Sequence, residues 1–86
     1  MASYRVELTR SAEKDLRRID RSQTGDIYSA LERLGQEPRP HGYRKLAGAD
    51  RSYRIRIGDY RVVYEIEDNV LVVLVIRIAH RKDAYR

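Results

Sequence analysis

Residues 53–66 read YRIRIGDYRVVYEI, and this stretch decides the fold. Tyr53, Ile55 and Ile57 alternate with two arginines, which is the two-residue period of a half-buried strand. The Gly-Asp pair at positions 58 and 59 is typical of a tight turn, and residues 60–66 return with a second set of apolar side chains. The stretch therefore predicts an antiparallel β-hairpin.

Further strands are predicted on both sides of this hairpin. Residues 67–69 (Glu-Asp-Asn) read as a polar turn, and residues 70–79 after them are almost all apolar. A continuous apolar strand is typical of the centre of a sheet, where at least one face is covered. Near the start of the chain, residues 4–8 alternate between apolar and polar side chains, which predicts a half-buried strand.

Two helices are predicted between the first strand and Pro38. Thr9 and Ser11 are both candidate N-caps of the first helix, and residues 20–24 are predicted as a polar turn before the second. Gly25 weakens the start of the second helix, which must end before Pro38 because proline cannot continue a helix. The apolar stripes of the two helices are formed by Ala12, Leu16 and Ile19 and by Ile27, Ala30, Leu31 and Leu34.

Together these elements predict one α+β domain over residues 1–86. The order is β-α-α-β-β-β, which we interpret as a small, mainly meandering antiparallel sheet with a two-helix hairpin packed on one face. A chain of 86 residues has too little interior for a buried cofactor in addition to a core, so no cofactor is expected.

Composition excludes several classes of protein. The chain has no cysteine and only two histidines, so a disulfide or a thiolate metal site is impossible and no metal site is expected. No apolar run approaches the length that crosses a membrane. The charged segment at residues 4–8 is unlike a secretory signal. We therefore expect a cytoplasmic protein.

The basic residues are unevenly distributed along the chain. Residues 1–37 carry seven basic and seven acidic side chains, whereas residues 38–86 carry eleven basic and six acidic ones. The whole net charge of +5 therefore arises in the second part of the chain. Such a bias indicates a surface that binds a polyanion.

Strand periodicity predicts where part of this charge lies. If Tyr53 and its alternate neighbours face the helices, Arg54 and Arg56 project together from the opposite face, and the hairpin brings Arg61 beside them. Three guanidinium groups so placed repel one another unless an anion or carboxylates intervene. The alternative interpretation is an ordinary solvated face, with Glu65 and Asp59 neutralising part of the cluster.

The chain also resembles a known family. The residues that carry the resemblance, in order, are Tyr4-Arg5-Val6, Ala12 and Leu16, Leu34 and Pro38, and Lys45-Leu46-Ala47-Gly48. The hairpin of residues 53–64 and the segment 75–85, which ends in His-Arg-Lys-Asp-Ala-Tyr, resemble the most specific motifs of the RelE/ParE superfamily of bacterial and archaeal toxins. The resemblance covers essentially the whole chain.

This resemblance implies an enzyme, a ribosome-dependent messenger-RNA endonuclease (mRNA interferase) that works without a metal. Such toxins cut mRNA in the ribosomal A site, where the 2′-hydroxyl of the RNA attacks the adjacent phosphate, and translation stops. The implied partners are mRNA, the ribosome with its 16S rRNA at the decoding site, and a cognate RelB-like antitoxin, with no membrane.

The residues that the resemblance places in the catalytic site are Arg54, Arg56, Arg61, Arg81 and Tyr85. Arg56 and Arg61 suit the stabilisation of negative charge on a five-coordinate phosphorus. Tyr85, ionising more readily among guanidinium groups, is the general-base candidate. Arg81 is expected to act electrostatically on the departing oxygen, because arginine rarely gives up its proton. The expected RNA-binding set is Arg54, Arg56, Lys45, His80 and Lys82.

Two other functions share many of these features. A ParE-like toxin has the same fold and hairpin but inhibits DNA gyrase and cuts no RNA, although it generally lacks this basic set and the His-Arg-Lys ending. A noncatalytic RNA-binding module would carry the same arginines. In that case Tyr85→Phe would leave growth arrest unchanged.

Overall fold

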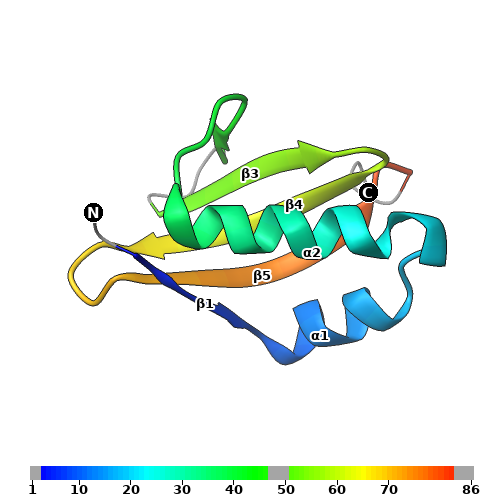
Figure 1. Cartoon of the computed structure of the whole chain (residues 1–86), viewed down its shortest axis with the longest axis horizontal. Helices are drawn as coiled ribbons and strands as arrows, with labels where there is room; N and C mark the ends of the chain where they lie inside the picture. Colours follow the sequence, from blue (N-terminus) through cyan, green and yellow to red (C-terminus); the bar gives the residue numbers. More distant parts are fainter. Residues whose placement is uncertain (1–2, 47–50, 83–86) are drawn as a thin grey trace.

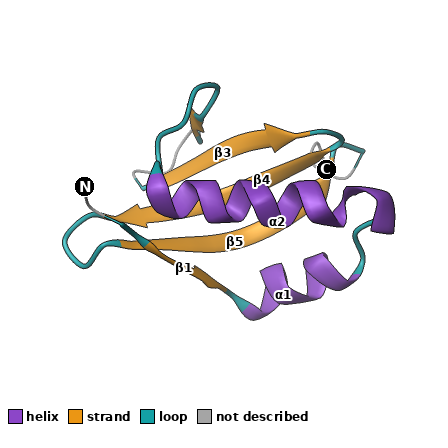
Figure 2. Cartoon of the chain, in the orientation of Figure 1, coloured by secondary structure: helices purple, strands orange, loops and turns teal. Residues whose placement is uncertain are grey.

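The computed structural model describes residues 3–46 and 51–82 (Figure 1). Its elements in chain order are β1 (Arg5–Leu8), α1 (Arg10–Arg17), α2 (Arg21–Gln36), β2 (Arg44–Lys45), β3 (Ser52–Ile57), β4 (Tyr60–Glu67) and β5 (Val72–His80). Both helices pack against one sheet, and α2 runs across β4 and β5 (Figure 2). The predicted α+β class, with its helical hairpin on a sheet, is confirmed.

The sheet is mixed rather than antiparallel throughout. Its five strands are ordered β1-β5-β4-β3-β2, and β5 holds the interior position expected of the apolar strand. The pairs from β2 to β5 are antiparallel, but β1 runs parallel to β5, with Arg5 opposite Val72. The prediction of an antiparallel sheet is therefore wrong for β1, and β2 is a strand that was not predicted.

The start of α2 corrects a second prediction. Residues 20–24 do not form a turn, because Asp20 is the N-cap of a helix that begins at Arg21, and its carboxylate accepts the Ser22 N–H at 3.0 Å. This bond satisfies one of the backbone donors left without a partner at the start of a helix. The predicted cap of α1 is confirmed at Thr9, whose hydroxyl accepts the Ala12 N–H at 3.1 Å.

The core lies between the helices and one face of the sheet. On β4 every second side chain is buried, from Tyr60 to Ile66, while the residues between them remain partly exposed on the other face. Ile27 and Leu34 from α2, Ala12 from α1, and several β4 and β5 residues have almost no exposed surface. The helix-free face of the sheet is therefore available for polar side chains.

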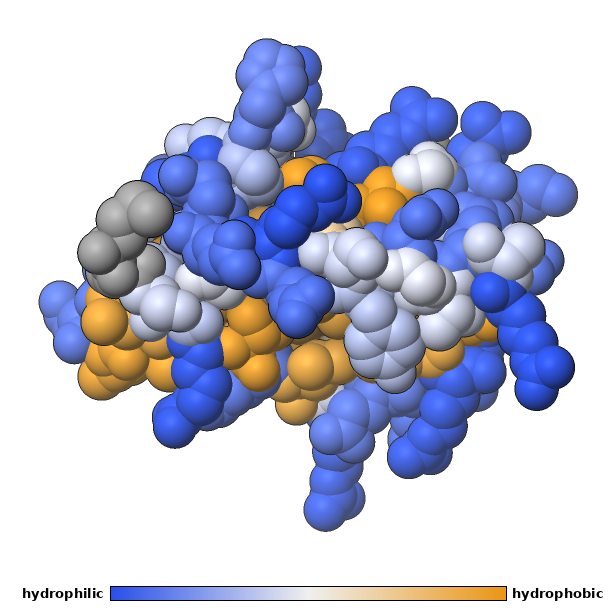
Figure 3. Space-filling view, viewed as in Figure 1, coloured by the Kyte–Doolittle hydropathy of each residue, from blue (hydrophilic) through white to orange (hydrophobic). Residues whose placement is uncertain are grey.

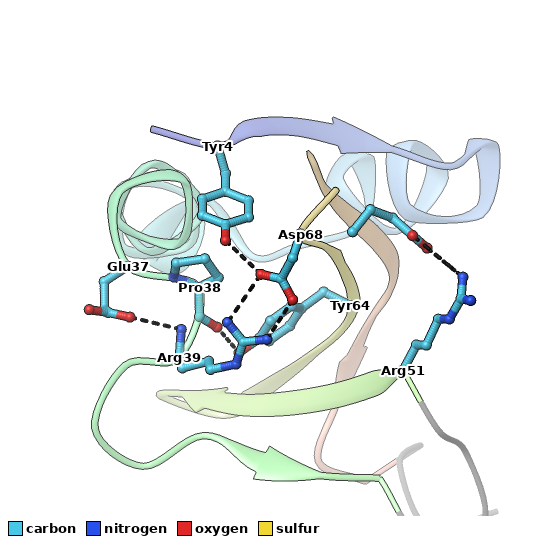
Figure 4. A network of polar contacts seen from close by, with 8 residues as sticks. Tyr4, Glu37, Pro38, Arg39, Arg51, Tyr64 and Asp68 are labelled. Carbon is cyan, nitrogen blue, oxygen red and sulfur yellow. Dashed lines mark hydrogen bonds and ion pairs between the residues drawn. The ribbon is translucent and has the colours of Figure 1, made fainter. Parts of the chain in front are cut away.

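A polar cluster at the β4–β5 turn fixes the segment that follows α2 (Figure 4). The Tyr4 hydroxyl donates to Asp68 Oδ1 at 2.6 Å, and the Arg39 guanidinium donates to both Asp68 oxygens at 3.3 and 2.9 Å. The buried Tyr64 hydroxyl donates to the Pro38 carbonyl at 2.8 Å, and its burial raises the pKa of this phenol to about 12. The bonds to Tyr64 and Asp68 therefore tie residues 38 and 39 to β4 and the turn that follows it.

Asp68 should make the stability of the protein depend on acid. Hydrogen bonds from Arg39 and Tyr4 lower the pKa of its carboxyl below the ordinary value of 3.8. A carboxyl whose pKa is lower in the folded than in the unfolded protein stabilises the fold at any pH above its unfolded-state pKa. This contribution is lost as the pH falls through its folded-state pKa. In thermal unfolding from about pH 7 to about pH 2, Asp68→Asn should be less stable than the wild type near neutrality, and the difference should shrink in acid. A difference that stayed constant would contradict this assignment.

No helix in the part of the chain that the structure describes is both long and apolar enough to cross a membrane.

Candidate nucleic-acid interface

The β3–β4 hairpin places arginines on the helix-free face, as the strand period predicts. Tyr53, Ile55 and Ile57 pack against the core, so Arg54 and Arg56 project from the opposite side. Arg61 on β4 stands directly opposite Arg56 in the register of the hairpin. Residues directly opposite each other in an antiparallel pair share a face, so these two side chains leave the sheet together.

The short strand β2 adds an arginine that the sequence did not reveal as part of this face. Arg44 stands directly opposite Arg54, whereas Lys45 stands opposite Tyr53. Arg44 therefore shares the face of Arg54, and Lys45 leaves the sheet on the other side. Only two residues form β2, which is too short for a periodic pattern, so no signal in the sequence marks it as a strand.

These side chains line two adjoining hollows. The first, of about 200 Å³, is lined by Gly42, Arg44, Arg54, Ile55, Arg56 and Arg61. The second, of about 340 Å³, is lined by Arg56, Asp59, Tyr60, Arg61, Arg81 and Lys82. Arg56 and Arg61 border both hollows, so the two form one basic surface, which we call the arginine cleft.

The turn between β3 and β4 organises the second hollow. Arg56 Nε donates to the Gly58 carbonyl at 3.2 Å, and the Arg81 backbone N–H donates to the Asp59 carbonyl at 2.7 Å. Gln23 from α2 accepts the Asp59 N–H at 3.3 Å. Gly58 has a φ of 57°, a left-handed conformation that glycine adopts at little cost. The turn thus brings Arg56 and Arg81, far apart in the sequence, to one place.

Four arginines of the cleft form no ion pair within the part of the chain that the structure describes. The ion pairs among the described residues lie outside the cleft. They join Arg5 to Glu7, Arg39 to Asp68, Arg51 to Glu67 and Arg77 to Asp15. Within residues 3–46 and 51–82, Arg44, Arg54, Arg56 and Arg81 have no carboxylate within ion-pairing distance, and Asp59 and Glu65 take part in no ion pair. Their charge is therefore left to an external anion or to solvent.

The remaining residues expected in the site lie in different places. Lys82 joins the second hollow, but His80 stands opposite the buried Tyr60 in the register of β4 and β5, and the rings meet edge to face with centroids 5.2 Å apart. Neither His80 nor Lys45 lines the arginine cleft. Tyr85 lies outside the described residues, as do Ala47 and Gly48 of the family motif.

A different kind of surface lies on the helix-bearing side. Apolar surface gathers along β1 below α2 (Figure 3), beside a hollow of about 430 Å³ to which Val6, Leu8 and Leu31 contribute. β1 is also an edge of the sheet, and such an edge offers unpaired backbone groups to a second chain. Among the described residues, no group of three or more His, Cys, Asp or Glu side chains is placed to hold a metal ion.

Comparison with known proteins identifies the family. Residues 6–85 match the family model of the ParE toxin of the type II toxin–antitoxin system parDE. The chain is 34% identical to toxin RelG of Mycobacterium tuberculosis, covering 96% of this chain and 97% of RelG. It is 29% identical to putative toxin RelE1 of Methanocaldococcus jannaschii, with 96% of each chain covered.

Solved structures agree with this relationship. The archaeal RelE–RelB complex from Pyrococcus horikoshii contains a chain that superposes with a TM-score of 0.82 at 28% identity, covering 95% of this chain and 99% of that one. The isolated RelE toxin of Escherichia coli gives a TM-score of 0.79 at 26% identity, covering 91% and 84%. The protein therefore belongs to the ParE toxin family and is a RelE-like toxin of the RelE/ParE superfamily.

Proposed function

We propose that this toxin is a ribosome-dependent endonuclease that cleaves mRNA in the ribosomal A site. The observation that carries the proposal is the arginine cleft, to which β3 contributes Arg54 and Arg56, β4 contributes Arg61, and the turn after β5 contributes Arg81. A surface with several guanidinium groups and an open approach suits a phosphodiester backbone, whose oxygens accept paired hydrogen bonds from arginine.

The proposed reaction uses the RNA's own 2′-hydroxyl as the nucleophile. Tyr85 takes the proton from this hydroxyl, and the 2′-oxygen attacks the neighbouring phosphorus. The bond from phosphorus to the 5′-oxygen then breaks, leaving a 2′,3′-cyclic phosphate and a 5′-hydroxyl whose proton comes from water. Arg56 and Arg61 stabilise the extra charge on phosphorus, Arg54 holds a flanking phosphate, and Arg81 stabilises the departing oxygen electrostatically.

Dependence on the ribosome follows from the chemistry of this set. Arginines stabilise charge well but exchange protons poorly, so the cleft by itself is expected to cleave free RNA slowly. Fixing the reacting groups in the correct geometry contributes much of the rate in such reactions, and the decoding site is proposed to supply that orientation. The site of action is then the cytoplasm.

A RelB-like antitoxin is the proposed second partner. The related archaeal structure is a RelE–RelB complex, and its RelE chain has the same fold as this protein. An antitoxin with acidic residues directed at the arginine cleft would bind tightly at low salt and more weakly as salt is added. The exposed half of α1 and the free edge of β1 are both candidate docking surfaces. Salt-independent association would favour a mainly apolar interface.

Inhibition of DNA gyrase is the competing function, and one observation favours it. The family model that matches residues 6–85 is that of the ParE toxin. The arginine cleft supports the nuclease over the gyrase inhibitor, because ParE-like toxins generally lack this basic set. Both activities can be measured on the same preparation.

The deciding experiment is primer extension on mRNA from a purified translation reaction, with a gyrase supercoiling assay run in parallel. We expect codon-phased cuts with the wild type, strong loss of cutting with Tyr85→Phe and Arg81→Ala, and unimpaired gyrase. Uncut mRNA together with inhibited gyrase would reject the nuclease. Toxicity that survives Tyr85→Phe, with RNA binding intact, would indicate a noncatalytic RNA-binding module.

A further inference from the structure

The arginine cleft contains two pairs of arginines that stand directly opposite each other on neighbouring strands. Arg44 on β2 opposes Arg54 on β3, and Arg56 on β3 opposes Arg61 on β4. Like charges in directly opposed positions of an antiparallel pair destabilise the sheet, because their Cβ atoms lie only about 5 Å apart. The Arg44–Arg54 pair therefore costs the fold stability, and an anion held between its two guanidinium groups would offset that cost.

The two pairs are separate in space but share one face. Arg54 and Arg56 are two residues apart on β3, so the pairs are displaced by about 7 Å along the strand. The Arg56–Arg61 pair borders both hollows of the cleft, whereas Arg44 and Arg54 line only the first. The first hollow is therefore an extension of the proposed cleavage site that has two further arginine side chains.

The segment that carries Arg44 is held in place by contacts distant from the cleft. The Pro38 carbonyl accepts a hydrogen bond from the Tyr64 hydroxyl, and the Arg39 guanidinium donates to the Asp68 carboxylate. Tyr43, immediately before Arg44, packs its ring against Tyr53 with centroids 5.6 Å apart. The segment that leads to Arg44 is thus held at residues 38 and 39 by hydrogen bonds and at Tyr43 by ring packing. This is the preorganisation that a binding subsite requires.

We propose that the Arg44–Arg54 pair is a second phosphate subsite, which binds the phosphate next to the one held by Arg56 and Arg61. The cleft then accepts two consecutive phosphates of single-stranded RNA, and Arg44 sets the register of the strand relative to the cleaved bond. The identity of the ligand rests on the proposed function. The existence of two anion subsites rests on the paired arginines.

Lys45 provides a matched control for this subsite. It is the neighbour of Arg44 on β2 and carries the same charge, but it stands opposite Tyr53 and leaves the sheet on the other face. Arg44→Gln and Lys45→Gln therefore remove the same charge from the same strand. Only Arg44→Gln removes a member of an opposed arginine pair.

The test compares two RNA ligands that cannot be cleaved because their 2′-hydroxyls are methylated. One is a dinucleotide with a single linking phosphate, and the other carries an additional 3′-phosphate. With the full 86-residue protein, titrations followed by nuclear magnetic resonance should show a gain in affinity of about tenfold from the second phosphate. Arg44→Gln should abolish this gain, and Lys45→Gln should retain it.

Salt dependence gives a second readout with a longer 2′-O-methyl RNA. Loss of one phosphate contact to a single strand lowers the slope of log affinity against log salt by about 0.7. We expect this change in Arg44→Gln and a smaller one in Lys45→Gln. Arg44→Lys, which keeps the charge but loses the planar fork, should lie between wild type and Arg44→Gln.

If Arg44→Gln and Lys45→Gln lost the same affinity for the second phosphate, the subsite would be overturned. The gain would then come from the overall positive charge of the protein and not from the Arg44–Arg54 pair. An Arg44→Gln protein that keeps the whole gain would overturn it as well. Binding is measured without cleavage, so the two proposals fail separately. A wild type that cuts no mRNA but shows the Arg44-dependent gain would reject the nuclease and keep the subsite.

Discussion

Arg56→Ala should lower the proposed cleavage of mRNA on the ribosome by about 10²- to 10³-fold, the usual effect of removing one group that stabilises charge in a transition state. Arg56 borders both hollows of the cleft and stands opposite Arg61. The only hydrogen bond that its side chain makes among the described residues is the one from Nε to the Gly58 carbonyl. Cleavage should therefore fall far more than stability does. The rate is measured by primer extension in a purified translation system.

Two controls separate this effect from a general loss of charge or fold. Arg10→Ala removes the same charge from an exposed position at the start of α1, on the helix-bearing side of the protein, and should leave cleavage unchanged. The unfolding temperature of Arg56→Ala should remain within a few degrees (about 5 °C) of the wild type, because the variant also removes a like-charge contact. A fall in cleavage that is matched by Arg10→Ala would contradict the assigned role.

Ile27→Ala should destabilise the protein by about 2–5 kcal/mol, which makes it the largest expected effect on the fold. The Ile27 side chain has no exposed surface and lies in the middle of the core between α2 and the sheet. α2 contains Gly25, a poor helix former, so its stability depends on this packed face more than on its own propensity. A loss of 2 kcal/mol corresponds to a fall in unfolding temperature of roughly 10 °C for a domain of this size.

Ser29→Ala is the matched control for Ile27→Ala. Ser29 is exposed on the same helix, two residues further on, and its replacement should change stability by less than about 0.5 kcal/mol. The free energy of unfolding of both variants and of the wild type is measured by urea titration. The dependence of this free energy on urea concentration should be the same in all three proteins. Similar stabilities for Ile27→Ala and Ser29→Ala would show that the core tolerates a cavity at this position.

The elements that could be predicted from sequence are those in which many residues repeat one pattern. The alternation in residues 53–66 gave the hairpin, the face of Arg54 and Arg56, and the position of Arg61. The parallel direction of β1 could not be predicted, because alternation in residues 4–8 indicates a strand but neither its partner nor its direction. The turn predicted at residues 20–24 was wrong because Asp20, a polar residue typical of turns, is equally typical of a helix N-cap.

In the candidate site, too, residues whose position depends on strand pairing or on single hydrogen bonds could not be predicted from the sequence. Arg44 was missed because its strand has two residues and takes its conformation from pairing with β3. Lys45 and His80 carry the right chemistry for RNA, yet register places Lys45 on the other face and sets His80 against Tyr60. The convergence of Arg56 and Arg81 depends on two hydrogen bonds to one turn, and neither bond leaves a pattern in the sequence.

The position of β5 has a consequence for the timing of folding during synthesis. β5 is made after every other described strand, yet it lies between β1 and β4 and pairs with both. A nascent chain whose residues 72–82 are still inside the ribosomal exit tunnel therefore lacks the strand that joins the two parts of its sheet, and Arg81 has not reached its turn. Pairing between distant segments is also slow to form. The sheet and the second hollow are therefore completed only once residues 72–82 have left the tunnel.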